Sequence, residues 1–133
     1  MMKSFGIRTG AHQELVDITA DVQRAVGDIG IADGVCFVYT PHTTAAITIN
    51  ENADPDVRHD IVRGLAHFQL EKVDFAHMEG NSPSHVKSSL VGCSETVFVE
   101  GGKLVLGTWQ GIYFCEFDGP RSRKVFVKVI SER

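Results

Sequence analysis

The last third of the chain alternates apolar and polar residues with a period of two, which is the period of a β-strand. Two glycines, Gly101 and Gly102, separate the first two of these segments, and such a pair indicates a tight hairpin. A turn around Gly119-Pro120 joins the last two segments into a second hairpin-like unit. A chain that ends in this way needs an antiparallel sheet, which constrains its fold more than any other feature. The four predicted strands are Thr96–Glu100, Lys103–Gly107, Gly111–Phe117 and Lys124–Ile130.

Three segments upstream carry helical signals. Thr19 is suited to cap a helix that runs to about Asp28. Asp54-Pro55-Asp56 combines an N-cap, a proline at the first helical position and an acid at the positive end of the helix dipole. Ser82-Pro83 begins a short helix to about Leu90. The helix after Asp54 carries a one-sided apolar stripe that we expect to face the core: Val57, Ile61, Leu65 and Phe68.

The order of the elements predicts the fold class. Strands, a helix, strands, helices and a final run of strands indicate a single α+β domain over residues 1–133. We expect a mainly antiparallel, sandwich-like sheet with two to three helices. The elements do not alternate as in a Rossmann fold, and neither GxGxxG nor a P-loop occurs. The upstream strands are predicted at Phe5–Thr9, Glu14–Ile18, Gly34–Tyr39 and Ala45–Ile49.

Composition excludes several classes of protein. Apolar residues make up 43% and charged residues 23%, which is typical of a globular domain and not of disorder. The net charge of −4 argues against a nucleic-acid binder. No apolar run approaches the roughly 20 residues of a membrane helix, and the first residues lack a signal-peptide core, so we expect a cytoplasmic protein without a membrane partner.

The three cysteines show no disulfide or zinc-finger pattern, since their number is odd and no CxxC pair occurs. Cys36 and Cys115 lie within apolar strand-like runs and are expected in the core. Cys93 lies in a Gly-Cys-Ser turn, and the sequence does not determine whether it is buried.

Five of the six histidines fall between residues 42 and 85. His59 and His67 share one stripe of the second predicted helix with Arg63, which favours a solvated face. His42 follows a strand at a corner marked by Pro41. It is either a site residue or a turn histidine whose ring nitrogens are hydrogen-bonded within the turn.

His77 and His85 bracket a Gly-Asn-Ser-Pro turn that opens the third helix. Neutral imidazoles are good ligands for zinc or a similar divalent ion. The same segment is also suited to an anion, because Asn81, Ser82, Lys87 and the free N–H groups of a helix start can bind phosphate.

Three further positions are candidates for chemistry. Glu51, in a run with two asparagines, is a general base, a metal ligand, a partner of a histidine, or part of a polar loop. Trp109 and Gln110, between two glycines, suit a pocket for a heteroaromatic ring, although a packing tryptophan is the simpler reading. Glu116 shares an otherwise apolar strand face and must lie at an edge, be paired, or be functional.

Four runs of the sequence together resemble the YjbQ family. They are His42–Ala46, Asn50–Val57, Gly80–Leu90 and Gly102–Ile112, of which the Leu-Gly-Thr-Trp-Gln run is the most specific. The resemblance covers nearly the whole chain. It implies a small α+β domain that forms a homotrimer, similar to proteins regarded as secondary thiamine-phosphate synthases. It further implies that His42, His77 and His85 hold a metal, with Glu51 nearby.

The resemblance implies a transferase that joins hydroxymethylpyrimidine diphosphate to thiazole phosphate and releases diphosphate. A divalent ion (zinc or magnesium), Lys87 and the helix start at Asn81 and Ser82 would neutralise the departing diphosphate. Trp109, flanked by Thr108 and Gln110, would stack on the pyrimidine, and Glu51 would orient a histidine or accept a proton. The alternatives are a metal-dependent hydrolase of another phosphorylated metabolite, or a non-catalytic trimeric protein that binds a metal or ligand. Because one small domain encloses only a modest cleft, the site of an enzyme of this size must be shallow, built around a metal, or shared between the subunits of the trimer.

Overall fold

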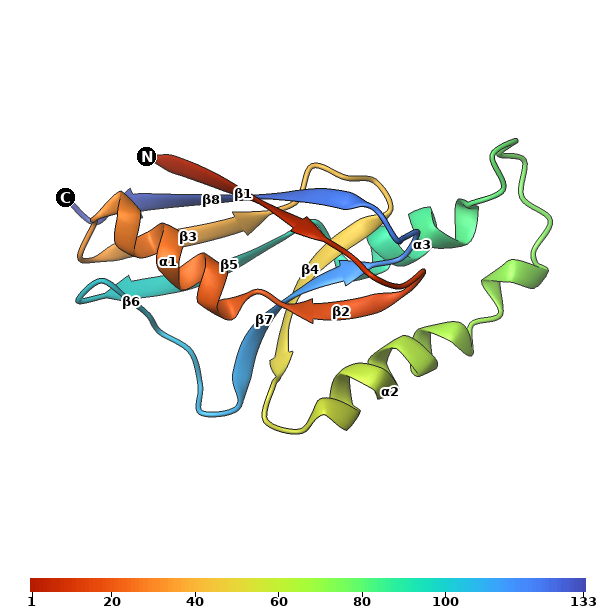
Figure 1. Ribbon diagram of the computed structural model, residues 1–133, viewed down its shortest axis with the longest axis horizontal. Coiled ribbons are helices and arrows are strands. Elements are labelled where there is room, and N and C mark those ends of the chain that lie inside the picture. The colour runs from red at the N-terminus through yellow and green to blue at the C-terminus, as the bar shows by residue number, and fades with distance from the viewer.

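The predicted alternation is realised in the last strand, β8 (Ser122–Ser131), where Val125, Val127 and Val129 are buried and their neighbours face outward. In this computed structural model, which describes residues 1–133, β8 lies inside a five-stranded sheet of order β1-β8-β3-β5-β6. A three-stranded sheet of order β2-β7-β4 packs against it, and every pairing is antiparallel (Figure 1). The predicted α+β class is therefore confirmed.

The remaining strands lie close to their predicted positions. The Gly101-Gly102 hairpin is confirmed, and both glycines have the positive φ angles, 58° and 77°, that such a turn requires. The strand after it, Lys103–Leu104, is shorter than predicted: one more hydrogen bond, from the Val105 N–H to the Phe98 carbonyl, continues the pairing before the chain crosses to the other sheet. The strands are β1 (Met2–Arg8), β2 (Glu14–Asp17), β3 (Gly34–Tyr39), β4 (Ala45–Glu51), β5 (Ser94–Glu100), β6 (Lys103–Leu104) and β7 (Gln110–Glu116).

Two apolar cores hold the layers together. The main core fills the space between the two sheets and α1 (Thr19–Ile29), with Ile47, Phe114 and Val127 among its fully buried side chains. A smaller core lies on the other face of the three-stranded sheet, where Tyr113 and Phe117 pack beneath the remaining helices. Strand β7 therefore has buried side chains on both faces, which explains its nearly continuous apolar sequence.

Helix α1 ends at Ile29, one residue beyond its predicted end, and is followed by Gly30 in the left-handed conformation, but Thr19 does not cap it. The Asp17 carboxylate accepts hydrogen bonds from the Thr19 N–H (2.9 Å) and hydroxyl (2.6 Å). The Thr19 hydroxyl oxygen in turn accepts the Ile112 N–H at 2.8 Å and so joins the helix to β7. The prediction was wrong because this tertiary contact competes for the hydroxyl.

Helix α2 (Pro55–Ala66) begins as predicted, with the Asp54 carboxylate accepting the Asp56 N–H at 2.9 Å. Its apolar stripe is not buried as expected: Ile61 and Leu65 are half-buried, and Phe68, beyond the helix, is 59% exposed. The reason is that α2 packs beside the edge strand β2, at the side of a narrow sheet (Figure 1). A short 3-10 turn (Leu70–Lys72) and α3 (Ser82–Val91) follow. None of the helices is long and apolar enough to cross a membrane.

Candidate functional site

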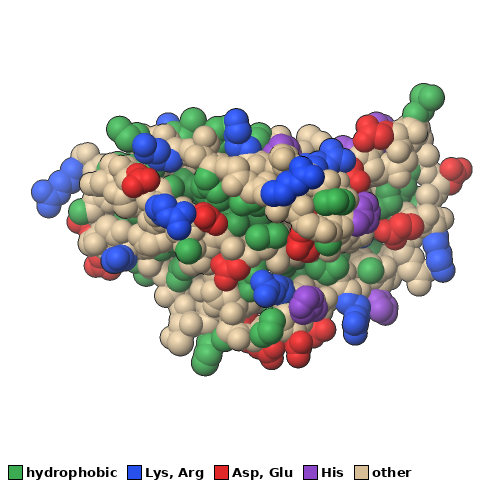
Figure 2. All heavy atoms as spheres, in the orientation of Figure 1, with side chains coloured by type: hydrophobic (Ala, Val, Ile, Leu, Met, Phe, Trp, Pro, Cys, Tyr) green, Lys and Arg blue, Asp and Glu red, His purple; other side chains and the backbone are tan.

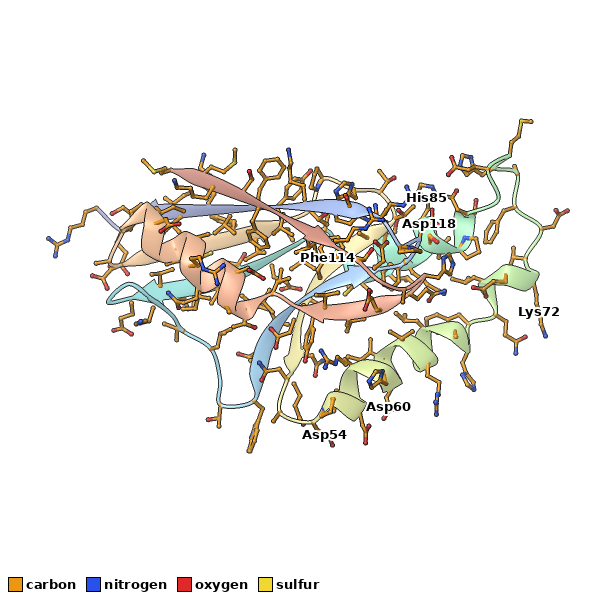
Figure 3. The ribbon with its side chains drawn as sticks, viewed as in Figure 1. Asp54, Asp60, Lys72, His85, Phe114 and Asp118 are labelled. Atoms are coloured by element: carbon orange, nitrogen blue, oxygen red, sulfur yellow. The ribbon has the colours of Figure 1, made fainter.

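A polar hollow of about 490 Å³ lies where the β3–β4 loop, the start of α3 and the β7–β8 turn meet. Figure 3 shows His85 and Asp118, from two of these segments, close together at this end of the molecule. We call this hollow the histidine pocket. It is lined by Pro41, His42, Thr43, Thr44, His77, Glu79, Asn81, His85, Arg121 and Arg123.

Two serines of α3 fasten the helix to the sheet and so position the pocket. Ser84 donates its hydroxyl to the Phe117 carbonyl, and Ser88 donates to the Ala45 carbonyl, both at 2.6 Å. Both serines are buried, so these hydrogen bonds are shielded from water. The start of α3 is therefore held against the ends of β4 and β7.

His77 and His85, the pair that the sequence suggested, do meet. Their ring centroids are 5.4 Å apart, and the rings are nearly perpendicular, at 83°. His42 lines the same pocket, so the structure brings all three predicted histidines to one hollow.

His42 is held in one tautomer. Its Nε2 accepts the Lys124 N–H at 2.9 Å, which places the ring proton of the neutral form on Nδ1. Burial lowers the pKa of His42, and the positive charge of Arg123 lowers it further. In this arrangement neither ring nitrogen offers a free lone pair to a metal, so His42 serves the pocket as a neutral hydrogen-bonding group.

A buried ion pair forms the floor of the pocket. The Arg123 guanidinium binds both carboxylate oxygens of Glu116, through Nε at 2.8 Å and through Nη2, and also donates to the Thr44 hydroxyl at 2.8 Å. Glu116 additionally accepts the Thr9 hydroxyl (2.7 Å) and the Asp118 N–H (3.0 Å). Burial alone would raise the pKa of Glu116, but these donors outweigh it and lower the pKa. Of the readings open for Glu116, the structure shows that it is paired.

Asn81, at the N-terminus of α3, has an unused acceptor. Its Nδ2 donates to Glu79 (3.0 Å) and to Asp118 (2.9 Å), while its buried Oδ1 has no hydrogen-bond partner. Since a buried oxygen without a partner is costly, this atom is suited to accept a hydrogen bond from a bound molecule.

Two predicted anion-binding residues lie outside the histidine pocket. Lys87 is buried, and its ammonium group donates to Gln13 (3.0 Å) and pairs with Glu71 at 3.5 Å. Ser82 is half-buried at the first turn of α3 and does not line the pocket. The positive groups that do line it, Arg121 and Arg123, were missed by sequence reasoning. Arg123 could have been found from the sequence, because it lies on the same inward face of β8 as the buried valines of that strand.

A second set of predicted residues lies at the opposite end of β4. Glu51 is opposite Gln110 in the β4–β7 register, and the Asn52 N–H donates to the Trp109 carbonyl at 2.9 Å. Trp109 is 62% exposed, and Thr108 beside it is exposed too. Figure 1 shows β4 running from the β3–β4 loop down to this end, next to the β6–β7 connection. Within one chain, Glu51 and Trp109 are thus separated from the histidines by the length of a strand.

The metal site expected from His42, His77 and His85 stays a prediction. No three His, Cys, Asp or Glu side chains lie close enough to hold a metal ion. The cysteines do not contribute: Cys36 and Cys115 are buried as predicted, and burial raises their pKa values to about 11 and about 12. Cys93 is exposed.

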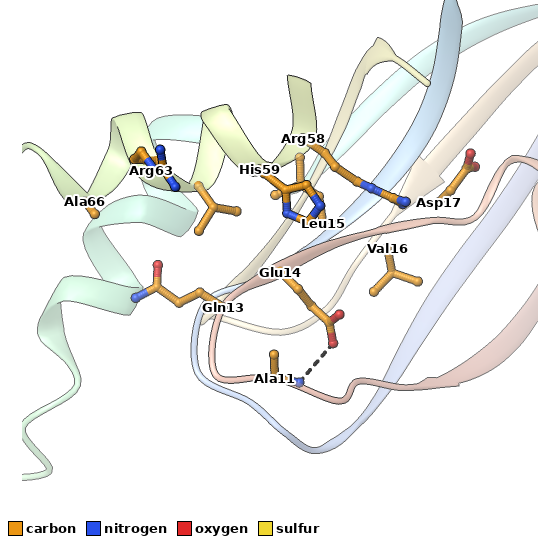
Figure 4. A pocket seen from close by; sticks show the side chains of 11 residues that line it. Ala11, Gln13, Glu14, Leu15, Val16, Asp17, Arg58, His59, Arg63 and Ala66 are labelled. Carbon is orange, nitrogen blue, oxygen red and sulfur yellow. Dashed lines mark hydrogen bonds between the residues drawn. The ribbon is translucent and has the colours of Figure 1, made fainter. Parts of the chain in front are cut away.

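A larger hollow, of about 930 Å³, lies between β2 and α2 (Figure 4). Arg58, His59 and Arg63 line it from the helix, and Glu14 and Asp17 from the strand. The Glu14 carboxylate accepts the Gly10 and Ala11 N–H groups and so serves the loop before β2. The exposed His59 confirms the predicted solvated stripe, and the hollow contains none of the predicted site residues.

Fold and pocket together define a class of small α+β proteins: two packed antiparallel sheets with a polar, histidine-lined pocket at one end. The model of the family described as "UPF0047 protein YjbQ-like" matches residues 3–132, and the chain belongs to this family. The chain is 52% identical to the UPF0047 protein MJ1081 of Methanocaldococcus jannaschii, over 100% of this chain and 96% of that protein. It is 51% identical to the UPF0047 protein YugU of Bacillus subtilis, over 98% and 99% of the two chains.

Solved structures share the fold over almost the whole chain. An uncharacterised YjbQ/UPF0047 family protein of Clostridium acetobutylicum superimposes with a TM-score of 0.93 at 53% identity, covering 96% of this chain and 99% of that one. A YbjQ-like protein of unknown function from Sulfolobus solfataricus gives the same TM-score at 33% identity, covering 99% and 97%.

Proposed function

We propose that the histidine pocket binds the phosphate groups of a small phosphorylated metabolite, and that the protein is a thiamine-phosphate synthase-like transferase. In that reaction the thiazole nitrogen bonds to the methylene carbon of hydroxymethylpyrimidine diphosphate, and the bond from this carbon to diphosphate oxygen breaks. The departing diphosphate takes the electron pair and must be stabilised as its charge develops.

The observation that carries the proposal is the fixed guanidinium of Arg123. Glu116 and Thr44 hold it in place, so it can receive a phosphate without losing further side-chain entropy. The exposed guanidinium of Arg121, held by Asp118 at 3.1 Å, and the neutral His42 add further donors around the hollow. The buried Asn81 Oδ1 would accept a donor from the same ligand.

We also propose a divalent ion and a homotrimer as part of this function. His77 and His85 would hold an ion such as zinc, for which two imidazoles are suitable but incomplete protein ligands. The ion would supply additional positive charge beside the phosphates. Elemental analysis of the purified protein, and of a His77→Ala/His85→Ala variant, tests this directly: bound metal should be present in the first and lost in the second.

The activity is tested by incubating the purified protein with both substrates and measuring thiamine phosphate and diphosphate. We expect the His77→Ala/His85→Ala variant to lose at least about 100-fold in rate, the usual scale for removing an acid–base or ligand group. The matched control is His59→Ala/His67→Ala, which removes two exposed histidines of the α2 segment and should change the rate less than about twofold. Absence of product with metal supplied, or equal rates in the two variants, would overturn the proposal.

A further inference from the structure

A second hollow, of about 620 Å³, adjoins the histidine pocket where β3 ends and β5 begins. Four residues line both hollows, so the two share a wall: Pro41, His42, Thr43 and His85. Figure 2 shows histidine side chains at this end of the molecule, with Lys or Arg side chains beside them. We call the second one the uncharged hollow. Its remaining lining residues are Tyr39, Thr40, Ser88, Ser89, Gly92 and Cys93.

Charge divides the two hollows. The histidine pocket contains the guanidinium groups of Arg121 and Arg123 and the Glu79 carboxylate, whereas no Lys, Arg, Asp or Glu side chain lines the uncharged hollow. An anionic group is most stable where donors and positive charges receive it, and a neutral group is most stable where no charge has to be desolvated. A molecule with a phosphate end and a neutral end therefore fits across the shared wall in one direction only.

Backbone hydrogen bonds fix the base of the uncharged hollow. Tyr39 occupies the last paired position of β3 with β5, and the Thr40 N–H donates to the Cys93 carbonyl at 3.0 Å. The Gly92 carbonyl accepts the Ile47 N–H at 3.0 Å, which joins the end of α3 to β4. The walls are thus in place before a ligand arrives, and a ligand that binds there orders little of the chain.

The side chains of the uncharged hollow offer a ring face and unused hydrogen-bond donors. The Tyr39 ring lines it and is 43% exposed. The Ser89 and Thr43 hydroxyl groups are exposed, and the His42 Nδ1–H is free because Nε2 accepts the Lys124 N–H. A flat heteroaromatic ring suits this set, since its faces stack on aromatic side chains and its ring nitrogens accept hydrogen bonds.

We infer that the uncharged hollow binds the heteroaromatic ring of a molecule whose phosphate groups, joined to the ring by a short linker, lie in the histidine pocket of the same chain. The ring site rests on the proposed phosphate site and supplies the other half of its ligand. Tyr39 then provides the stacking surface within this chain, since Trp109 lies at the opposite end of β4. His42 and His85, on the shared wall, lie beside the linker between ring and phosphate.

Calorimetry with two diphosphate esters tests this division of the ligand. Methyl diphosphate and hydroxymethylpyrimidine diphosphate share the phosphate end and differ in the ring, and a divalent ion is supplied to both. We expect the ring compound to bind at least about tenfold more tightly, the scale of one ring stacked on an aromatic side chain. Equal affinities would overturn the inference. Failure of both compounds to bind would overturn it together with the phosphate site.

Substitutions of Tyr39 locate the ring. Tyr39→Ala should remove most of the preference for the ring compound and leave the affinity for methyl diphosphate unchanged, whereas Tyr39→Phe should keep the preference because it keeps the ring. The matched control is Phe98→Ala, which removes an exposed aromatic ring of β5 that lines neither hollow. Full preference in Tyr39→Ala, or an equal loss in Phe98→Ala, would contradict the assignment. Circular dichroism establishes that each variant is folded.

Cys93 provides a measurement on the unaltered chain. It is exposed, and it lines the uncharged hollow but not the histidine pocket. At ten times its Kd the ring compound leaves about one site in eleven open, so alkylation of Cys93 by iodoacetamide should slow about tenfold. Methyl diphosphate at the same saturation should change the rate less than about twofold, because it lies on the other side of the shared wall. Equal rates with the two compounds would overturn the inference.

These measurements are independent of turnover, because thiazole phosphate is left out. Absence of thiamine phosphate in the activity assay would contradict the proposed transferase and leave the ring site standing. Conversely, product formation with unprotected Cys93 and no ring preference would leave the transferase standing and overturn the ring site.

Discussion

At the scale of single residues, the charges that matter most in this protein are the buried ones. Glu116 and Arg123 are 0% and 5% exposed, whereas Asp21 and Arg24 form an ion pair on the surface of α1. A surface pair contributes little because water screens it, but breaking a buried pair leaves an uncompensated charge.

We therefore expect Glu116→Gln to reduce the free energy of unfolding by about 3–5 kcal/mol. The variant keeps the size of the side chain but removes the charge that balances Arg123. Urea denaturation measures the loss, with Asp21→Asn as a control expected to change stability by less than about 1 kcal/mol. Similar losses in the two variants would contradict a special role for the buried pair.

The neutral state of His42 predicts a pH dependence at the same scale. Because folding lowers the pKa of His42, the native chain resists protonation that the unfolded chain accepts. The contribution of neutral His42 to the free energy of unfolding is therefore fully present above the pKa that His42 has in the unfolded chain. It is lost as the pH falls through the lower pKa that His42 has in the folded chain.

Urea denaturation between about pH 7 and pH 5 should show this loss, and His42→Gln should flatten the profile in that range. NMR titration of the His42 ring should give a midpoint below the ordinary value of a histidine. A midpoint above that ordinary value would be the contrary result.

At the scale of elements, local signals determined where helices begin, and tertiary contacts determined how deeply they are buried. Asp54 and Pro55 start α2 in the predicted manner. The stripe that includes Ile61 and Leu65 is only half-buried because the helix packs at the edge of three strands. Periodicity thus predicted which side of α2 faces the protein but not how much of that side is covered.

The cap of α2 gives a prediction at this scale. Asp54→Ala should destabilise the protein by about 1 kcal/mol, because the Asp56 N–H would lose its partner. Asp60→Ala, an exposed change within the same helix, should alter stability by less than about 0.5 kcal/mol. Thermal or urea unfolding measures both, and an equal effect would indicate that the cap contributes nothing.

At the scale of the whole molecule, two cores share one central strand. Cys36 lies in the main core and Cys115 in the smaller one, while Cys93 is exposed. A thiol reagent therefore reports separately on the surface and on each core.

We expect one thiol to react at once in the native protein, and the other two to react at a rate limited by opening of the cores. The raised pKa values of Cys36 and Cys115 slow their reaction further, since the thiolate is the reactive form. Denaturant should expose all three. Fast reaction of a Cys93→Ser variant without denaturant would contradict the two closed cores.

The candidate site was predictable in part. The segments around His42, His77, Asn81 and His85 were found from residue type and position, and the structure joins them in one pocket. Arg121 and Arg123 were not found. Lys87 does not line this pocket, because its ammonium group pairs with Gln13 and Glu71 instead.

The sequence by itself determined the strand alternation, the hairpin, the α2 cap and the family, because each depends on neighbouring residues or on motifs kept in order. Only the tertiary structure decided which polar groups meet. The Asn81–Asp118 contact spans 37 residues and the Thr9–Glu116 contact spans 107, and such pairings depend on how the sheets pack. The same packing separated Glu51 and Trp109 from the histidines, because β4 places its two ends at opposite sides of the molecule.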